Sequence, residues 1–167
     1  QLWEKPISTI KGTTELEKLM DSDSPAIAFN DIVFAANYNG SLTRFNIRGG
    51  EKVFSVDLST SKPFVLYKDK IIAVSSDDEI IAFDAINGSE IWKNSKFKFR
   101  GLTPPTIYDN FLYFGDIEGY LHKLNPETGD IIGLEETKLN AVTQIEAYAN
   151  KLFAQDVAGS VYVFEIK

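Results

Sequence analysis

The hydrophobic pattern of the chain consists of short apolar runs, each of which begins after two or three polar residues. These runs occupy 30–37, 68–75, 109–116 and 150–157. They recur at intervals of about forty residues, which is the period of several repeat architectures. Apolar runs of this length, bounded by turn residues, predict β-strands.

A second pattern follows each run: a turn, and then a strand in which apolar and polar residues alternate. The last apolar residues of these strands have the same period, and they are Phe45, Phe83, Leu124 and Phe164. A third pattern has Asn or Asp followed four residues later by Gly, and it occupies 46–54, 84–92 and 125–133. It predicts a tight hairpin turn, because Gly adopts the positive φ that other residues resist.

Each unit also begins with an apolar stretch, so that one unit contains four short strands joined by tight turns. Four antiparallel strands in a repeat of about forty residues are typical of a β-propeller blade. We therefore predict an all-β fold, in which residues 1–167 form a partial β-propeller of about four blades. The predicted blades are 24–58, 62–98, 102–138 and 142–167. The alternative is an all-β sandwich of irregular strands, which the agreement of two repeat registers disfavours.

The two ends of the chain complement one another in this scheme. The fourth predicted blade lacks its outermost strand, whereas residues 1–8 match an outermost strand, because LWEK at 2–5 corresponds to IWKN at 91–94. We predict that residues 1–8 are the outer strand of an upstream blade, in a mature or excised half of a larger propeller. A further hypothesis is that they pair with 161–167 and complete the last blade. Trp3 then corresponds to Trp92, whose ring we expect to pack between neighbouring blades.

The segment 9–24 breaks the repeat, because it is longer than the other connections between blades. A capping-box spacing at 14–17 precedes Leu19 and Met20, which continue an apolar pattern with helical intervals. We predict a short helix or turn there, followed by an acidic loop at 21–24. An insertion into a repeat usually lies on the binding face, although a solvated connector has the same kind of sequence.

Charge and composition exclude several classes of function. The chain has 167 residues and a net charge of −7, so that it repels the phosphate backbone of nucleic acids. It has no cysteine, which excludes disulfides, thiolate metal sites and a cysteine nucleophile. The apolar runs are all shorter than the ~20 residues that a membrane-spanning helix needs.

Few residues offer catalytic chemistry. The single histidine, His122, lies in the middle of a predicted strand, where a histidine is more often structural or exposed than catalytic. The acidic residues at 77–79 occupy a predicted turn, and turn formation explains them without acid–base catalysis. The sequence has no calcium loop, phosphate-binding glycine loop or nucleophile elbow. We therefore predict a protein that is not an enzyme and has no catalytic, cofactor-binding or metal-binding residue.

DAINGSEIWK at 84–93 resembles the repeat of pyrroloquinoline-quinone (PQQ)-type propellers, a class that contains quinoprotein dehydrogenases and cofactor-free scaffolds. GTTELEKLMDSD at 12–23, IVFAANYNGSLT at 32–43 and the run from LTPPTIY to NPETGD at 102–130 resemble the C-terminal half of the BamB family of outer-membrane assembly lipoproteins. This resemblance implies about half of an eight-bladed propeller, without enzyme activity or cofactor. It also implies a location in the periplasm, at the inner face of the outer membrane. The family is held there by a lipidated N-terminal cysteine that this chain lacks.

The resemblance implies the partners as well. Proteins of this family bind the periplasmic POTRA domains of BamA and assist the insertion of outer-membrane proteins, so that unfolded outer-membrane proteins are a further candidate partner. The BamA-binding surface of the family includes two aspartates, which correspond here to Asp21 and Asp23. Their carboxylates could accept charge-assisted hydrogen bonds from Arg or Lys, and Leu19 and Met20 could add an apolar anchor.

Two alternative functions use the same kind of repeat. A fragment of a PQQ-dependent dehydrogenase would carry a calcium–quinone site on the propeller axis and usually a pair of adjacent cysteines, and neither is recognisable in the sequence. Another secreted propeller could use the repeat to sense a ligand.

Overall fold

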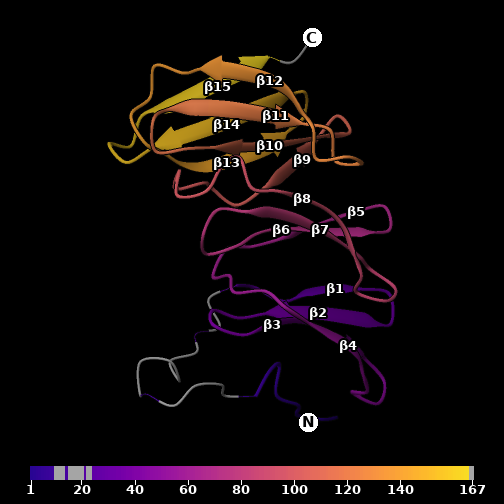
Figure 1. Ribbon diagram of the computed structural model, residues 1–167. Coiled ribbons are helices and arrows are strands. Elements are labelled where there is room, and N and C mark those ends of the chain that lie inside the picture. The colour runs from indigo at the N-terminus through magenta and orange to yellow at the C-terminus, as the bar shows by residue number, and fades with distance from the viewer. Residues whose placement is uncertain (10–13, 15–20, 22–23, 166–167) are drawn as a thin grey trace.

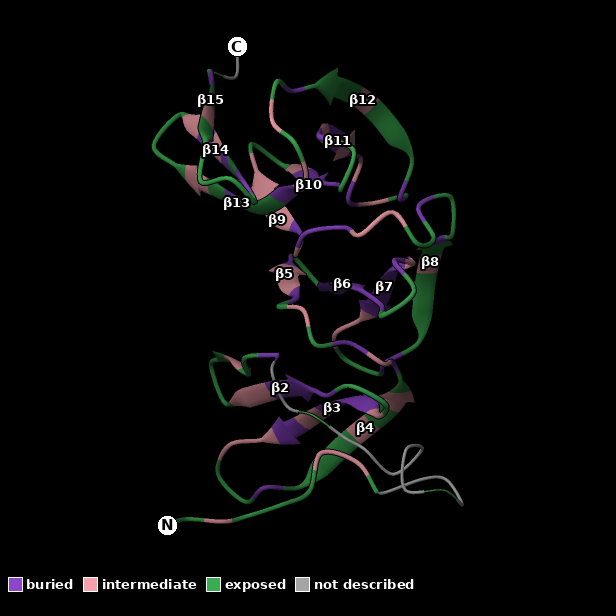
Figure 2. Cartoon of the chain, turned by 90° about the vertical axis from the view of Figure 1, so that its left-hand side faces the viewer, coloured by how far each residue is buried: buried purple, intermediate pink, exposed green. Residues whose placement is uncertain are grey.

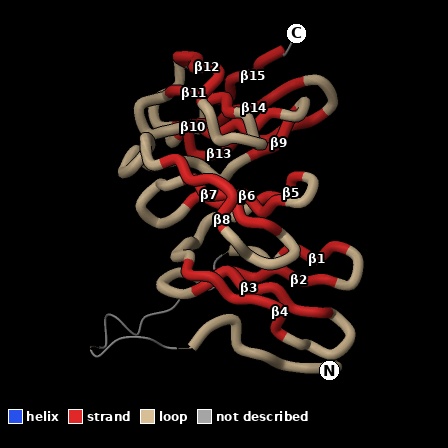
Figure 3. Tube along the Cα trace, turned by 45° about the vertical axis from the view of Figure 1, so that its right-hand side comes forward, coloured by secondary structure: helices blue, strands red, loops and turns tan. Residues whose placement is uncertain are grey.

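The structure is a computed structural model, and it describes residues 1–9, 14, 21 and 24–165. Within this part of the chain, every regular element is a β-strand, as the tube in Figure 3 shows. The short helix that the sequence predicts before position 21 falls on residues outside the described ones.

The strands form four antiparallel sheets, and each sheet contains strands that are consecutive along the chain. The first sheet contains β1 (Ile27–Phe29), β2 (Ile32–Ala36), β3 (Ser41–Asn46) and β4 (Lys52–Asp57). The second contains β5 (Val65–Tyr67), β6 (Lys70–Val74), β7 (Ile80–Asp84) and β8 (Glu90–Asn94). The third contains β9 (Thr106–Tyr108), β10 (Phe111–Gly115), β11 (Tyr120–Leu124) and β12 (Ile131–Glu136). The last has three strands, β13 (Val142–Tyr148), β14 (Lys151–Asp156) and β15 (Val161–Glu165).

The sheets are stacked in chain order, with the N-terminus at one end of the stack and the C-terminus at the other (Figure 1). The middle strands β6 and β10 are almost entirely buried, whereas the outermost strands β4, β8 and β12 are largely exposed (Figure 2). Four-stranded meanders packed face to face are the blades of a β-propeller. The predicted all-β propeller fold is thereby confirmed, and we refer to the sheets as blades 1 to 4.

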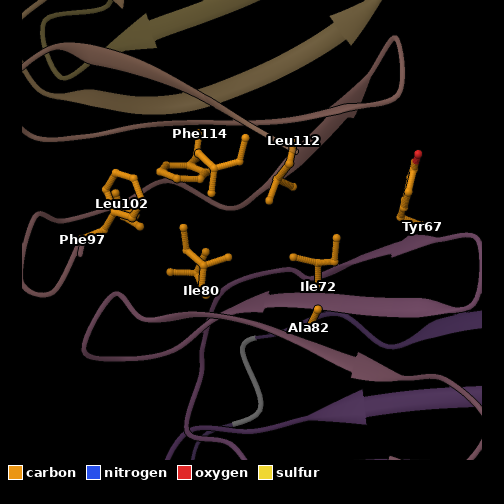
Figure 4. Close-up of a cluster of buried hydrophobic side chains, with 10 residues drawn as sticks. Tyr67, Ile72, Ile80, Ala82, Phe97, Leu102, Leu112 and Phe114 are labelled. Carbon is orange, nitrogen blue, oxygen red and sulfur yellow. The ribbon is translucent and has the colours of Figure 1, made fainter. Parts of the chain in front are cut away.

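The hydrophobic core consists of layers between neighbouring blades. In the layer shown in Figure 4, Ile72, Ile80 and Ala82 of blade 2 face Leu112 and Phe114 of blade 3, and all five side chains are fully buried. Burial of apolar surface in these layers is the main force that holds one blade to the next.

A capping residue shapes the turn between the second and third strands of every blade. In each blade, a side-chain oxygen at the end of the second strand, or directly after it, accepts a hydrogen bond from the backbone N–H four residues later. The four capping residues are Asn37, Ser75, Asp116 and Asp156. Amide, hydroxyl and carboxylate side chains all have the required acceptor, which explains why this position is polar in every unit.

The predicted hairpin turns between the third and fourth strands are also confirmed. The N–H groups of Gly50, Gly88 and Gly129 donate to the carbonyl four residues earlier at 2.8–2.9 Å. All three glycines have positive φ, between 68° and 80°. Each also lies directly under an aromatic ring, so that an added Cβ would come within 2.5–2.7 Å of Trp3, Phe54 or Trp92, respectively.

These three pairs, which we call the aromatic–glycine contacts, join consecutive units. Trp92 of blade 2 covers Gly129 of blade 3, and its Nε1 donates to the carbonyl of Pro126 at 3.1 Å. The prediction that Trp92 packs between blades is therefore confirmed. Phe54 has no such donor, and in its contact Nη1 of Arg44 donates to the carbonyl of Ala85 at 3.0 Å instead.

Residues 1–9 contain no strand, and they pack against blade 1. Trp3 covers Gly50 and lies 5.8 Å from the ring of Phe45, while the carbonyl of Ile7 accepts a hydrogen bond from Thr43 Oγ1 at 2.8 Å. The hypothesis that residues 1–8 pair with the end of the same chain is wrong, because the whole stack of blades separates them from β15 (Figures 1 and 2). That they form the outer strand of an upstream blade stays a prediction.

Candidate protein-interaction surface

The turns after the second strands and the connections between blades lie on the same side of the sheets, which we call the link face. There, the backbone N–H of the residue after each capping residue donates to a carbonyl in the preceding connection. The pairs are Tyr38 to Asp21, Ser76 to Ser59, Ile117 to Arg100, and Val157 to Ala141, at 2.8–3.2 Å. Asp21 is therefore the point at which the long segment 9–24 returns to the repeat.

Asp21 lies on the link face, at the start of the described part of the acidic segment. Its backbone forms a β-bridge with Tyr38, while the residue as a whole is exposed. Ser24 is buried three residues later, where its hydroxyl donates to the carbonyl of Lys62 at 2.9 Å. Asp21 is thus bound to the turn of blade 1, and Ser24 is bound to the connection between blades 1 and 2. Of the other predicted site residues, Leu19, Met20 and Asp23 lie outside the described part of the chain.

A groove of about 520 Å³ lies between the turns of blades 1 and 2, and Tyr38, the residue bridged to Asp21, lines it. Its wall on the blade 1 side includes Tyr38 and Asp57, and its wall on the blade 2 side includes Asp77 and Glu79. Because Asp57 and Asp77 are exposed carboxylates, the groove adds negative charge next to Asp21.

Serine side chains join the two walls of this groove. The hydroxyls of Ser59 and Ser76 lie 2.8 Å apart, and the Ser59 hydroxyl also accepts a hydrogen bond from the N–H of Asn39 at 2.9 Å. The turn of blade 1, the following connection and the turn of blade 2 therefore form one hydrogen-bonded unit. A surface that is preorganised in this way loses less conformational entropy when a partner binds.

Glu79, in the blade 2 wall of the groove, forms ion pairs with other residues of the same chain. Its carboxylate forms ion pairs with Lys93 at 2.6 Å and Lys98 at 3.1 Å, and it accepts a hydrogen bond from Ser95 at 2.8 Å. The hydrogen bond from Lys93 is the largest of the effects that lower the pKa of Glu79 to about 2. Because these cations offset its charge, Glu79 contributes little to the negative potential of the groove.

The single histidine belongs to a buried polar cluster in blade 3. Nε2 of His122 lies 2.8 Å from Oδ2 of Asp116, and the same oxygen accepts hydrogen bonds from Nε and Nη2 of Arg100 at 3.0 and 2.7 Å. Burial alone would raise the pKa of Asp116, but hydrogen bonds from His122, the N–H of Tyr120 and Arg100 outweigh it and lower the pKa.

The contacts of this cluster stabilise the turn and the core of blade 3. Oδ1 of Asp116 caps the turn through the N–H groups of Glu118 and Tyr120, so that both carboxylate oxygens are occupied by donors. The His122 ring packs against Phe97 and Phe114, with ring centroids 4.9 and 5.4 Å away. Among the described residues, no group of three or more His, Asp or Glu side chains could hold a metal ion.

Sequence patterns alone did not identify the groove residues Tyr38, Asp57 and Asp77. The repeat contains part of the signal, because Tyr38 and Asp77 follow capping positions and Asp57 ends an outermost strand. The sequence does not show how blades 1 and 2 pack against each other, and this packing brings the three side chains to one groove.

The meander blades, the capped turns and the aromatic–glycine contacts together define a β-propeller built from PQQ-type repeats. The sequence profile of one family of such propellers, described as outer membrane protein assembly factor BamB, matches residues 1–94. The chain belongs to this family.

Individual relatives agree with this assignment. Outer membrane protein assembly factor BamB of Yersinia pestis is 31% identical over 164 residues, which are 98% of this chain and 42% of the relative. The crystal structure of BamB from Moraxella catarrhalis is 32% identical with a TM-score of 0.90, and the match covers 99% of this chain and 49% of that one. The chain thus spans less than half the length of these relatives.

The chain also has a more distant structural similarity to an enzyme. Quinohemoprotein alcohol dehydrogenase from Comamonas testosteroni has a TM-score of 0.58 at 18% identity, over 70% of this chain and 21% of that one. At this level of identity the two proteins share the fold alone. Among the described residues, no helix is long and apolar enough to span a membrane.

Proposed function

We propose that the chain is part of a non-enzymatic scaffold subunit of the outer-membrane β-barrel assembly machinery. In this proposal, the subunit lies in the periplasm at the inner face of the outer membrane, binds the POTRA domains of BamA and assists the insertion of outer-membrane proteins. Membership of the BamB family supports the general role, because the relatives are named as outer membrane protein assembly factors.

The observation that carries the proposed binding site is the position of Asp21. This residue lies near the end of the long interruption of the repeat, its backbone is hydrogen-bonded to blade 1, and the residue is exposed. A carboxylate whose backbone is fixed in this way can accept a charge-assisted hydrogen bond from a partner Arg or Lys without ordering a flexible loop.

The groove next to Asp21 extends this surface. A basic segment of the partner that binds Asp21 and Asp23 would continue past Tyr38 toward Asp57 and Asp77, where it again meets negative charge. Such complementarity mainly increases the association rate and the specificity of binding, and it weakens as salt screens the charges.

The test is a binding titration between the full-length protein and the isolated POTRA domains of BamA. Asp21→Arg combined with Asp23→Arg should weaken binding by about tenfold or more, because it places two cations where the partner cations bind. The matched control is Asp31→Arg with Asp130→Arg, two exposed carboxylates in turns on the opposite face.

Both double variants change the net charge by the same amount, so that a general electrostatic effect would weaken both equally. Loss of binding in the link-face variant alone supports the site. Unchanged binding by that variant would show that Asp21 and Asp23 are not the site, and absence of binding by the unmodified protein would overturn the proposed partner.

A further inference from the structure

Phe99, in the connection between blades 2 and 3, is an exposed aromatic residue with a strained backbone. It is 73% exposed, and its φ of 61° lies in the left-handed region, where a bulky side chain is rare. Of the eight described residues other than glycine that have positive φ, five are Asn or Asp, and Phe99 is the only aromatic one. Because its ring is exposed, burial of apolar surface does little to offset the cost of this conformation.

Hydrogen bonds hold the backbone on both sides of this strained position. The N–H of Phe99 donates to the carbonyl of Asp77, in the turn of blade 2, at 3.1 Å. The N–H groups of Gly101 and Leu102 donate to the buried carboxylate of Asp78, in the same turn, at 2.7 and 3.1 Å. The connection is thus bound to the turn at three points, so that the backbone that carries the exposed ring is fixed on the link face.

The fold does not require phenylalanine at this position. The hydrogen bonds come from backbone groups of the connection, and asparagine or glycine would allow them with less strain. Phe99 makes no aromatic contact with the described residues, whereas Phe97 is 3% exposed and its ring lies 5.0 Å from that of Phe114. A residue that breaks a local rule without a gain in packing is typical of a binding site.

A second exposed apolar residue lies close to Phe99. Ile117, in the turn of blade 3, is 56% exposed, and its N–H donates to the carbonyl of Arg100, the residue after Phe99, at 3.1 Å. Its side chain covers Gly101, where an added Cβ would come within 2.3 Å of Cγ2. Phe99 and Ile117 therefore form an apolar patch on the link face, where blades 2 and 3 meet.

This apolar patch continues the surface that carries the proposed partner site. Asp77, which accepts the hydrogen bond from Phe99, also lines the groove between blades 1 and 2. The carbonyl of Arg100 accepts the link-face hydrogen bond of blade 3, as the carbonyl of Asp21 does in blade 1. In the sequence, Phe99 directly precedes Arg100 as Met20 directly precedes Asp21. Phe99 thus has the same place in the repeat as an apolar anchor that the sequence predicts.

We propose that Phe99 is an aromatic anchor of the link face, and that it inserts into an apolar pocket of the partner that binds Asp21. This role rests on the proposed function, because the partner is the same. Lys98 and Arg100 are both paired with carboxylates of this chain, whereas Asp77 is an exposed carboxylate. The pocket that fits is therefore apolar, with Lys or Arg at its border. Aromatic residues that become buried on binding are frequent hot spots of protein interfaces.

The test compares the partner affinity and the stability of the full-length protein after substitution of Phe99. Phe99→Asn removes the ring and introduces a residue that adopts positive φ readily. It should weaken binding to the isolated POTRA domains of BamA by about tenfold or more, and it should raise the melting temperature by about 1–3 °C. Because the lost contact is apolar, this weakening should be the same at low and high salt.

Two further variants serve as controls. Phe99→Leu keeps both an apolar side chain and the strain, so that it should lose less affinity than Phe99→Asn and should not raise the melting temperature. Phe29→Asn removes a phenylalanine that is 60% exposed, lacks positive φ and precedes a turn on the opposite face. It should leave the affinity unchanged and should not raise the melting temperature.

The outcomes separate the role of Phe99 from the proposed function. If the unmodified protein does not bind the POTRA domains, both are wrong. If it binds them and Phe99→Asn binds equally well, only the role of Phe99 is wrong. A lower melting temperature of Phe99→Asn would show that the ring supports the fold, and an equal loss of affinity in Phe29→Asn would show a general effect, so that either result contradicts the anchor. Weaker binding of Phe99→Asn alone, with a raised melting temperature, supports it.

Discussion

Trp92 contributes to stability in two separable ways. Its ring covers Gly129, where the positive φ and the close approach both require glycine, and its Nε1 donates to the carbonyl of Pro126. The ring is half-buried rather than fully buried, because it lies on an outermost strand. The two contributions can be measured with two substitutions.

We expect Trp92→Ala to lower the free energy of unfolding by about 2–4 kcal/mol, because it removes most of the buried ring surface between blades 2 and 3. Trp92→Phe should lower it by only about 1 kcal/mol, because the ring contact remains and one hydrogen bond is lost. Phe54 already performs this role over Gly88. Urea denaturation of the three proteins measures both values, and equal losses would show that the hydrogen bond, not the ring, dominates.

For individual residues, some contacts could be predicted from the sequence and others could not. The packing of Trp92 and the glycine turns were predictable, because both recur at fixed positions in the repeat. The cluster of Asp116, Arg100 and His122 was not, because it joins a strand, a turn and a connection whose relative positions depend on two packed blades. A repeat predicts what its units share, and this cluster occurs in one unit.

At the scale of elements, ion pairs fix the connection between blades 2 and 3. Glu79 immediately precedes β7, and its partners lie on β8 and in the connection that follows, at Lys93, Ser95 and Lys98. One carboxylate thus holds a strand and the start of the connection together. Its side chain is 14% exposed, so that solvent screens these interactions only in part.

The lowered pKa of Glu79 predicts a specific dependence of stability on pH. Its folded pKa of about 2 lies below its ordinary value of 4.5, so that the unfolded chain binds the proton first as the pH falls. The stabilisation should be complete above about pH 5, and it should be lost progressively as the pH approaches 2. We expect Glu79→Gln to lower the free energy of unfolding by about 1–3 kcal/mol at neutral pH.

The measurement is urea denaturation of both proteins over this pH range. The difference between them should narrow toward pH 2, because the unmodified carboxyl is then protonated as well. If the difference in the free energy of unfolding does not change with pH, Glu79→Gln destabilises the protein for a reason other than the loss of charge.

The elements also show why the candidate site could be predicted only in part. The interruption at 9–24 was visible as a break in the repeat, and Asp21 is on the link face, as an insertion at that position requires. The groove was not predictable, because its walls come from two blades. Residues 1–8 have the pattern of a strand but form none, because a strand needs a neighbouring strand to accept its backbone hydrogen bonds.

The strict chain order of the strands has a consequence for how the protein forms. Every sheet is completed by strands that follow one another directly, so that no sheet within the described chain waits for a distant segment. Short loops between paired strands limit the entropy that loop closure costs, and units of this kind can fold one after another as a chain is delivered from its N-terminus. Each new blade could then pack against the one before it. We therefore expect the blades to form in the order in which they follow one another along the chain.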